Sequence, residues 1–316
     1  MDNKNWIKFR MVLWSIVAIL LALVLITGIK GWSGNTFSNN IFNRSFSISS
    51  MKVVKELKFD DINNIKNIKT DFNASDLIIT ENDEDDIKVI VKCNKTLKNK
   101  KYINAEINSD TLSIDDFNNK SSRNIFGMSS GYYLQVEIKI PKSYKENITI
   151  NNIVGDITFD SDLNLNDLYI DVKTGDIDGN QNINSKKIYI NNKVGNIDFN
   201  YLYGKEITID AKTGDVDIDK FSGKGSIESK VGDITCNIEN LDGDFKVESK
   251  VGDVNLYINK NLSFIFEGNK SFGDLYTGLE FNNVSQSSDS FVGQYGENPV
   301  NKINANVKTG DISIND

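Results

Sequence analysis

The sequence predicts an all-β protein, a β-solenoid of roughly 20-residue Gly-Asp repeats that follows a short β region and one N-terminal transmembrane helix. Three observations support this fold class. A glycine followed by Asp or Asn recurs at near-constant spacing in the C-terminal half. Apolar and polar residues alternate on both sides of each glycine, and an uncharged apolar run begins at Met11.

The apolar run Met11–Ile29 contains nineteen residues without a charge or a proline. As a helix it is long enough to span a hydrocarbon core of about 30 Å. Lys4, Lys8 and Arg10 precede the run, which favours a cytoplasmic N-terminus over residues 1–10 and a membrane helix over residues 11–29. A cleaved signal peptide is the alternative, although no small-x-small cleavage site follows. Either reading places the later residues outside the cytoplasm.

Residues 30–50 are rich in Gly, Ser and Asn and predict a flexible stalk. Residues 51–146 alternate between apolar residues and turn-forming clusters, which predicts an N-terminal β region. Within it, the pattern of Ile103–Ile114 predicts a hairpin. The expected strands are Asn67–Lys69, Leu77–Thr80, Ile87–Lys92, Ile103–Asn108, Thr111–Ile114 and Tyr133–Ile140.

Two loops of this region have an alternative reading each. Glu81–Asp86 is acidic and is expected to be a solvated turn, with a calcium site as the alternative. Asn118–Gly131 is a polar insertion, and its Ile125, Phe126 and Met128 make it either a loose loop or a contact tip.

Residues 147–316 carry the repeats, whose glycines are separated by 20, 20, 19, 18, 20, 21 and 37 residues. Glycine accepts positive φ, and Asp or Asn can hydrogen-bond its own backbone two residues on, so each step is expected to be a structural turn. The residues of these turns are Gly155, Asp156, Gly175, Asp176, Gly195, Asn196, Gly214, Asp215, Gly232, Asp233, Gly252, Asp253, Gly273, Asp274, Gly310 and Asp311.

Apolar residues two positions after each glycine, and five and seven before most of them, share one strand face and predict the core. The opposite face carries rows that repeat once per coil. Acidic or amide residues stand four positions before the glycine, as in Asp171 and Glu248, and lysines stand two before it. We expect these rows to neutralise each other. The lysines are Lys173, Lys193, Lys212, Lys230 and Lys250.

The repeated Gly-Asp step also suggests a calcium-binding β-roll. The period is about twice that of a nine-residue roll, each repeat has one glycine, and the lysines would compete with a cation. We therefore expect turns and no metal or cofactor. Leu279–Asn301 interrupts the pattern and is expected to hold a degenerate coil and a long loop. Asn315 and Asp316 are expected to protect the edge of a terminal coil.

Composition narrows the function. The net charge is −8, and because the first thirty residues contribute +3, the rest carries −11, which disfavours nucleic acid as a partner. The chain has no histidine, which removes the commonest general base and the usual nucleophile pairs. Cys93 and Cys236 form no CxxC pattern and are expected to be apolar fillers. We identify no catalytic residue and expect no enzyme.

A strand of V-x-I-x-I-P type, found in Tyr133–Phe159, leads into steps such as KTGDIDG and SKVGDVNL. This pattern resembles the bacterial "putative adhesin" β-strand-repeat family, a toastrack-like β-solenoid family of unknown function, over roughly residues 65–316. The membrane-anchored architecture is similar to LiaG-type proteins, which accompany cell-envelope stress systems. The resemblance implies a fold and surface exposure, and it carries no site residues over.

Three functions follow as hypotheses. The first is a non-enzymatic, membrane-anchored extracytoplasmic module acting as an adhesin or as an envelope scaffold or stress-response accessory, with an envelope protein or cell-wall glycan as partner. The second is a polysaccharide-binding or polysaccharide-acting β-helix protein. The third is self-association through the solenoid ends or through an aromatic patch. That patch is Phe264, Phe266, Phe272 and Tyr276, of which Phe264 and Phe266 share the core face.

Overall fold

The computed structural model describes residues 51–60, 62–96, 101–116 and 133–316. The predicted anchor and stalk and the whole polar insertion Asn118–Gly131 lie outside these ranges. Within them, no helix is long and apolar enough to cross a membrane, and the helical segment that occurs is the short 3-10 helix η2 (Ile62–Asn64). Residues 52–316 form one compact unit with its own hydrophobic core.

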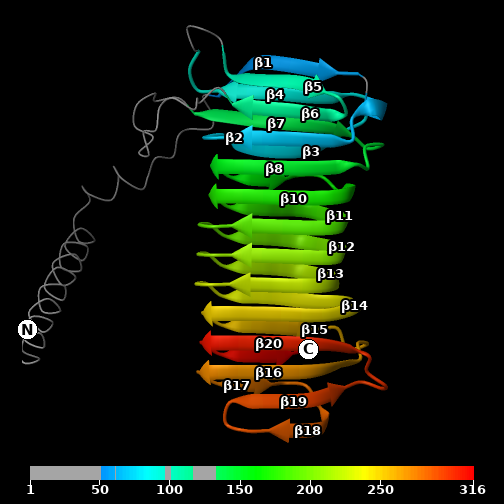
Figure 1. Cartoon of the computed structure of the whole chain (residues 1–316), viewed down its shortest axis with the longest axis vertical. Coiled ribbons are helices and arrows are strands. Elements are labelled where there is room, and N and C mark those ends of the chain that lie inside the picture. The colour runs from blue at the N-terminus through cyan, green and yellow to red at the C-terminus, as the bar shows by residue number, and fades with distance from the viewer. Residues whose placement is uncertain (1–50, 61, 97–100, 117–132) are drawn as a thin grey trace, which may run out of the picture. The chain divides into compact units, whose positions relative to one another are not determined.

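The described chain is all-β, and its twenty-one strands belong to one continuous hydrogen-bonded sheet wound into stacked coils (Figure 1). The middle of the stack runs in sequence order with parallel pairing from coil to coil. Ile150, Ile170 and Ile190 occupy the same register position on successive coils. The strands here are β8 (Asn147–Val154), β9 (Ile157–Phe159), β10 (Leu163–Thr174), β11 (Ile177–Asn192), β12 (Ile197–Ala211), β13 (Val216–Ser229), β14 (Ile234–Val251) and β15 (Val254–Ile258).

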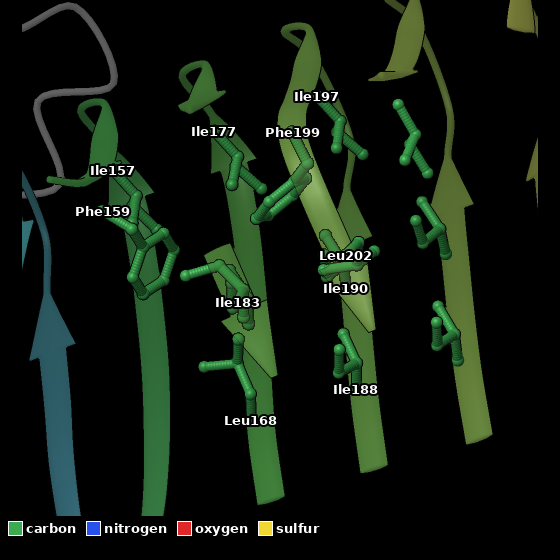
Figure 2. Close-up of a cluster of buried hydrophobic side chains, with 14 of the residues drawn as sticks. Ile157, Phe159, Leu168, Ile177, Ile183, Ile188, Ile190, Ile197, Phe199 and Leu202 are labelled. Carbon is green, nitrogen blue, oxygen red and sulfur yellow. The ribbon is translucent and has the colours of Figure 1, made fainter. Parts of the chain in front are cut away.

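The core lies inside the coils and consists of rows of like residues (Figure 2). Ile157, Ile177 and Ile197 are in register on β9, β11 and β12 and are each at most 1% exposed. Burial alternates along strands such as β8 and along most of β12, so the period of two puts one face inside and the other in solvent. A neighbouring row holds Phe159, Gly179 and Phe199.

The C-terminal coils do not follow the order of the sequence. Strand β20 (Asn301–Thr309) pairs in parallel with β14 on one side and with β16 (Phe264–Phe272) on the other. Strand β21 (Ile312–Asn315) lies in the same way between β15 and β17 (Leu275–Thr277). The last coil of the chain is therefore inserted between two earlier ones.

The end of the stack is a hairpin. Strand β19 (Ser290–Tyr295) runs antiparallel to β16 and also to β18 (Asn282–Gln286), which is fully exposed. The expectation that Asn315 and Asp316 protect a terminal coil was wrong, because the coil that contains Asn315 is internal. The β18–β19 hairpin, and not a degenerate coil, occupies the interrupting stretch Leu279–Asn301.

The N-terminal end shows the same interleaving. Strand β2 (Asn67–Phe72) pairs in parallel with β6 (Thr111–Asp116) and β8, and β3 (Asp76–Asn82) with β7 (Leu134–Pro141) and β9. Strands β2 and β3 thus form a coil of the same stack. The structure also shows the hairpin of β5 (Ile103–Asn108) and β6, and β4 (Ile87–Cys93) antiparallel to both β7 and β1 (Lys52–Phe59).

Candidate functional site

The Gly-Asp steps line one edge of the stack, where the strands of one face end and the chain crosses to the next strand (Figure 1, left edge). The eight glycines have φ between +128° and +149°. A Cβ on Gly195 would lie 2.0 Å from the carbonyl oxygen of Gly175 on the preceding coil. Only glycine satisfies both the backbone conformation and this close approach.

The residues after the glycines form a hydrogen-bonded ladder between coils. The backbone N–H of Asp176 donates to Oδ1 of Asp156 at 2.9 Å, and the same bond recurs along the edge from Asp76 to Asp274. The expected hydrogen bond of each side chain to its own backbone is therefore wrong, since the acceptor oxygen serves the neighbouring coil. The remaining ladder members are Asn196, Asp215, Asp233, Asp253 and Asp311.

One coil makes this turn without glycine. Asn73–Ser75 precede Asp76, and the buried carboxylate of Asp116 accepts hydrogen bonds from the backbone N–H groups of Asn73 and Ala74, both at 2.9 Å. The Ser75 hydroxyl donates to the same carboxylate at 3.1 Å. A carboxylate from the adjacent coil thus holds this turn by hydrogen bonds. No repeat signal marks this turn in the sequence.

The lysine row stands beside the turn edge, and each of its lysines is exposed. Within the described residues, none of Lys173, Lys193, Lys212, Lys230, Lys250 and Lys308 forms an ion pair or a side-chain hydrogen bond. The acids of the neighbouring row have partners that do not belong to the lysine row. Glu228 and Glu248 pair with Lys246 at 3.4 and 3.0 Å, and Asp210 accepts from the Tyr189 hydroxyl. The expected neutralisation between the rows was wrong.

A trough of about 840 Å³ runs between these rows across five coils and the terminal β16 strand. One wall is lysine and the other is amide and carboxylate, while Ala211, Ser229 and Ser249 contribute from the strand between them. Six lysines line the trough against three carboxylates, so its local charge is positive in a chain of net charge −8.

Three carboxyl groups of the described residues have a raised pKa. Burial raises the pKa of Asp76 to about 6; the backbone N–H of Asp156 opposes this rise and the Asp156 carboxylate adds to it. Burial and neighbouring aspartates also raise the pKa of Asp178 and Asp198, which are adjacent in register. Among the described residues, no three Asp, Glu or Cys side chains converge as a metal site.

The acidic loop Glu81–Asp86 is held by lysines. Lys88 pairs with Glu84 at 2.7 Å, Lys142 with Asp83 at 2.7 Å, and Lys58 with Asp86 at 2.9 Å. Cys93 and Cys236 are free thiols and both are buried. Burial raises the pKa of the Cys236 thiol, which suppresses its reactivity.

The aromatic residues divide into two groups. Phe264 and Phe266 are fully buried and pack on Phe281, which itself contacts Phe291 of the terminal hairpin. Phe272 and Tyr276 are 70% and 54% exposed. The proposed patch is therefore split between the core and the surface.

A pair of surface tyrosines, Tyr169 and Tyr189, was not predicted from the sequence. Tyr169 and Tyr189 stack at 4.9 Å between ring centroids with an interplanar angle of 13°. They line a shallow depression of about 660 Å³ together with Asp167, Lys187 and Glu206. The 20-residue spacing of the two tyrosines is the signal that marks them as neighbours.

These features define a class, the β-solenoid-like repeat proteins that expose regular side-chain rows on coils joined by Gly-Asp turns. Within this class, residues 65–315 match the family model described as Toastrack DUF4097, and the chain belongs to that family. Its function is not defined by the family.

Solved structures to which this chain is similar include a "putative adhesin" from Bacteroides fragilis, at 14% identity and TM-score 0.49, covering 82% of this chain and 96% of that one. Another, titled "Putative lipid binding protein", is from Parabacteroides distasonis, at 13% identity and TM-score 0.49, covering 84% and 97%. A third "putative adhesin", from Parabacteroides merdae, has 11% identity and TM-score 0.48 and covers 84% and 97%. No curated protein matches the chain.

Proposed function

We propose that this protein is a non-enzymatic, membrane-anchored extracytoplasmic binding scaffold, an adhesin or a cell-envelope accessory. The observation that carries the proposal is the regular exposure of the same side chains once per coil along the turn edge and the trough. Such rows suit binding to an extended partner, because each coil adds an equivalent contact. A catalytic site requires the opposite, a few unlike residues that converge on one point.

The location in the proposal depends on Met11–Ile29 and on the basic residues before it. The buried cysteines make a direct test feasible. Cys93 and Cys236 are 1% and 0% exposed, so a membrane-impermeant maleimide should not label them in the folded protein. Ser288→Cys introduces one exposed thiol in the terminal loop, and Asn5→Cys introduces one in the predicted cytoplasmic segment.

In intact cells, Ser288→Cys should be labelled, whereas Asn5→Cys should be labelled only after permeabilisation. The unmodified chain is the control for background labelling of the native thiols. If Ser288→Cys is protected in intact cells but labelled in lysed cells, the extracytoplasmic location is wrong. Recovery of the chain in the membrane fraction, at the mass that retains residues 1–30, tests the anchor against a cleaved signal.

A polysaccharide-acting enzyme is the second candidate. It is favoured by the adjacent aspartates Asp178 and Asp198, since a raised carboxyl pKa is a property of general acids. A panel of glycans incubated with the purified chain tests this reading. If the chain turns over a glycan, and if Asp178→Asn or Asp198→Asn abolishes this turnover, the protein is an enzyme and the scaffold proposal is wrong.

A further inference from the structure

We infer that the trough is a binding site for an extended, hydroxyl-rich polyanion, an anionic glycan or a phosphodiester-linked polyol. This inference rests on the proposed scaffold function and specifies the ligand. The cationic wall of the trough consists of one lysine from each of five adjacent coils: Lys193, Lys212, Lys230, Lys250 and Lys308.

The lysines of this wall are unpaired. They are exposed, and within the described residues no acid lies within ion-pair distance of any of them. Neighbouring coils lie about 4.8 Å apart, so the row places like charges side by side. Lysines at these positions do not stabilise the fold through ion pairs. An anion bound along the row would remove the repulsion between them.

The opposite wall of the trough carries hydrogen-bond acceptors. Asn191, Asp210, Glu228, Glu248 and Asn306 present amide and carboxylate oxygens to the trough. Glu228 and Glu248 are already paired with Lys246, and Asn306 donates to Glu248 at 3.2 Å. The remaining oxygens on these groups are acceptors for hydroxyl donors. A ligand that fits both walls therefore carries anions on one side and hydroxyls on the other.

The shape of the trough favours an extended ligand. The trough crosses coil after coil with the same two rows, so it matches a chain with repeating groups better than a compact molecule. The amide and carboxylate wall disfavours single-stranded DNA, because the DNA backbone carries phosphates without hydroxyls that could donate to this wall. An anionic membrane is a plane, and an elongated trough between two walls offers it no matching surface.

The test is binding of labelled polymers to the full chain, purified in mild detergent. Alginate supplies carboxylates with hydroxyls, and poly(glycerol phosphate) supplies phosphodiesters with hydroxyls. Dextran is neutral, polyphosphate has anions without hydroxyls, and single-stranded DNA and vesicles with one third phosphatidylglycerol represent the competing classes. The variant Lys212→Gln/Lys230→Gln/Lys250→Gln removes three row lysines. The control Lys205→Gln/Lys220→Gln/Lys224→Gln removes three exposed lysines that do not line the trough.

We expect alginate or poly(glycerol phosphate) to bind, with affinity that falls as salt rises, and dextran not to bind. The trough variant should lose about tenfold or more in affinity while the control variant loses little, since each lysine contributes one anion contact. Which of the two polymers binds more tightly identifies the anion. Circular dichroism melting shows that both variants are folded.

Absence of binding to both hydroxyl-rich polymers overturns the inference, as does an equal loss in the control variant. Binding of DNA or vesicles that equals or exceeds polymer binding also overturns it. Equal binding of polyphosphate removes the role assigned to the amide and carboxylate wall. These results are independent of the cysteine labelling, so a chain that is surface-exposed but binds no polyanion would reject this inference alone.

Discussion

Two constraints require glycine at each Gly-Asp turn. The backbone needs a φ near +135°, as at Gly195. The carbonyl oxygen of the glycine on the preceding coil also lies where a Cβ atom would stand. Gly243 is different, because its φ is ordinary and a Cβ there would meet only the flexible side chain of Lys224 at 2.9 Å. The two positions therefore form a matched pair for testing the turn.

We expect Gly195→Ala to lower the free energy of unfolding by about 2–4 kcal/mol, because the backbone is strained and cannot move away from the neighbouring coil. Gly243→Ala should cost less than about 1 kcal/mol. Urea unfolding of the 51–316 fragment, followed by circular dichroism, measures both. Similar costs for the two variants would show that the close approach of the turns is unimportant.

Each side chain of the Asp/Asn hydrogen-bond ladder must supply an acceptor oxygen, but it need not carry a charge. Asn196 already fills one position, where its Oδ1 accepts from the Asp215 N–H at 3.0 Å. At the first position, Asp76 is largely buried and its carboxyl pKa is raised to about 6. The folded state therefore binds the proton more tightly than the unfolded state, so stability falls as pH rises from about 4 to 6 and the loss is complete above 6.

Asp76→Asn should remove this pH-dependent loss while keeping the acceptor for the Asp156 N–H. At pH 7 we expect the variant to be more stable than the natural chain by about 1–2 kcal/mol, and the difference to vanish near pH 4. Unfolding free energies between pH 4 and 7.5 measure it. A difference that is negative at pH 7, or that does not change with pH, contradicts the assignment. Asp215→Asn checks that an amide supports the ladder elsewhere.

At the scale of residues, the sequence predicted positions better than partners. The glycines and the core alternation are visible because each depends on one residue and its parity. The partners of the aspartates and lysines are not visible. Oδ1 of Asp156 could reach either its own backbone or the next coil, and Lys246, which binds Glu228 and Glu248, stands outside the repeated rows.

At the scale of elements, the main feature is that both ends of the stack are interleaved. Strands β20 and β21 are internal although they end the chain, and they bury Ile303, Ala305 and Ile312. They therefore join the terminal strands β16 and β17 to the body of the stack. Loss of the internal coil breaks parallel pairing on both of its faces, whereas loss of the end hairpin breaks only its antiparallel pairing with β16.

We expect deletion of residues 301–316 to abolish hydrogen-exchange protection in Phe264–Tyr295 and to leave β10–β12 protected, because coils interact mainly with their neighbours. Replacing the hairpin 282–295 with a Gly-Ser linker removes nearly as many residues and should leave β14, β20 and β16 protected. Hydrogen exchange with mass spectrometry distinguishes the two. Retained protection of Phe264–Phe272 after the deletion of 301–316 would mean that the inserted coil does not hold the end of the stack.

The period of the repeats predicted the coils but not their order in space. A repeat such as VKTGDISI pairs equally well with any coil of the same pattern, so its sequence does not say which two coils it joins. Strand β1 was missed for another reason. Its sequence KVVKELKF is charged and half exposed, since it pairs only with β4 and covers no complete core face.

At the scale of the whole molecule, the two ends of the stack differ in how their edges are protected. Strand β1 at one end carries Lys52, Lys55 and Lys58, and charged residues on an edge strand oppose pairing with another chain. At the other end, β18 (sequence NNVSQ) has no charge and no proline, and it pairs only with β19 (Figure 1). Val284 on this strand is 50% exposed.

We expect the 51–316 fragment to self-associate through β18, because an uncharged edge with free backbone groups offers hydrogen bonds to a second copy. Val284→Lys should shift the fragment toward the monomer, since two copies would place lysines against each other. Val300→Lys is the matched control, because Val300 is 86% exposed and lies outside any strand. Light scattering over a concentration range measures the mass of each form. If Val284→Lys and Val300→Lys associate equally, the β18 edge does not mediate assembly, and the exposed Phe272 and Tyr276 become the surface to change next.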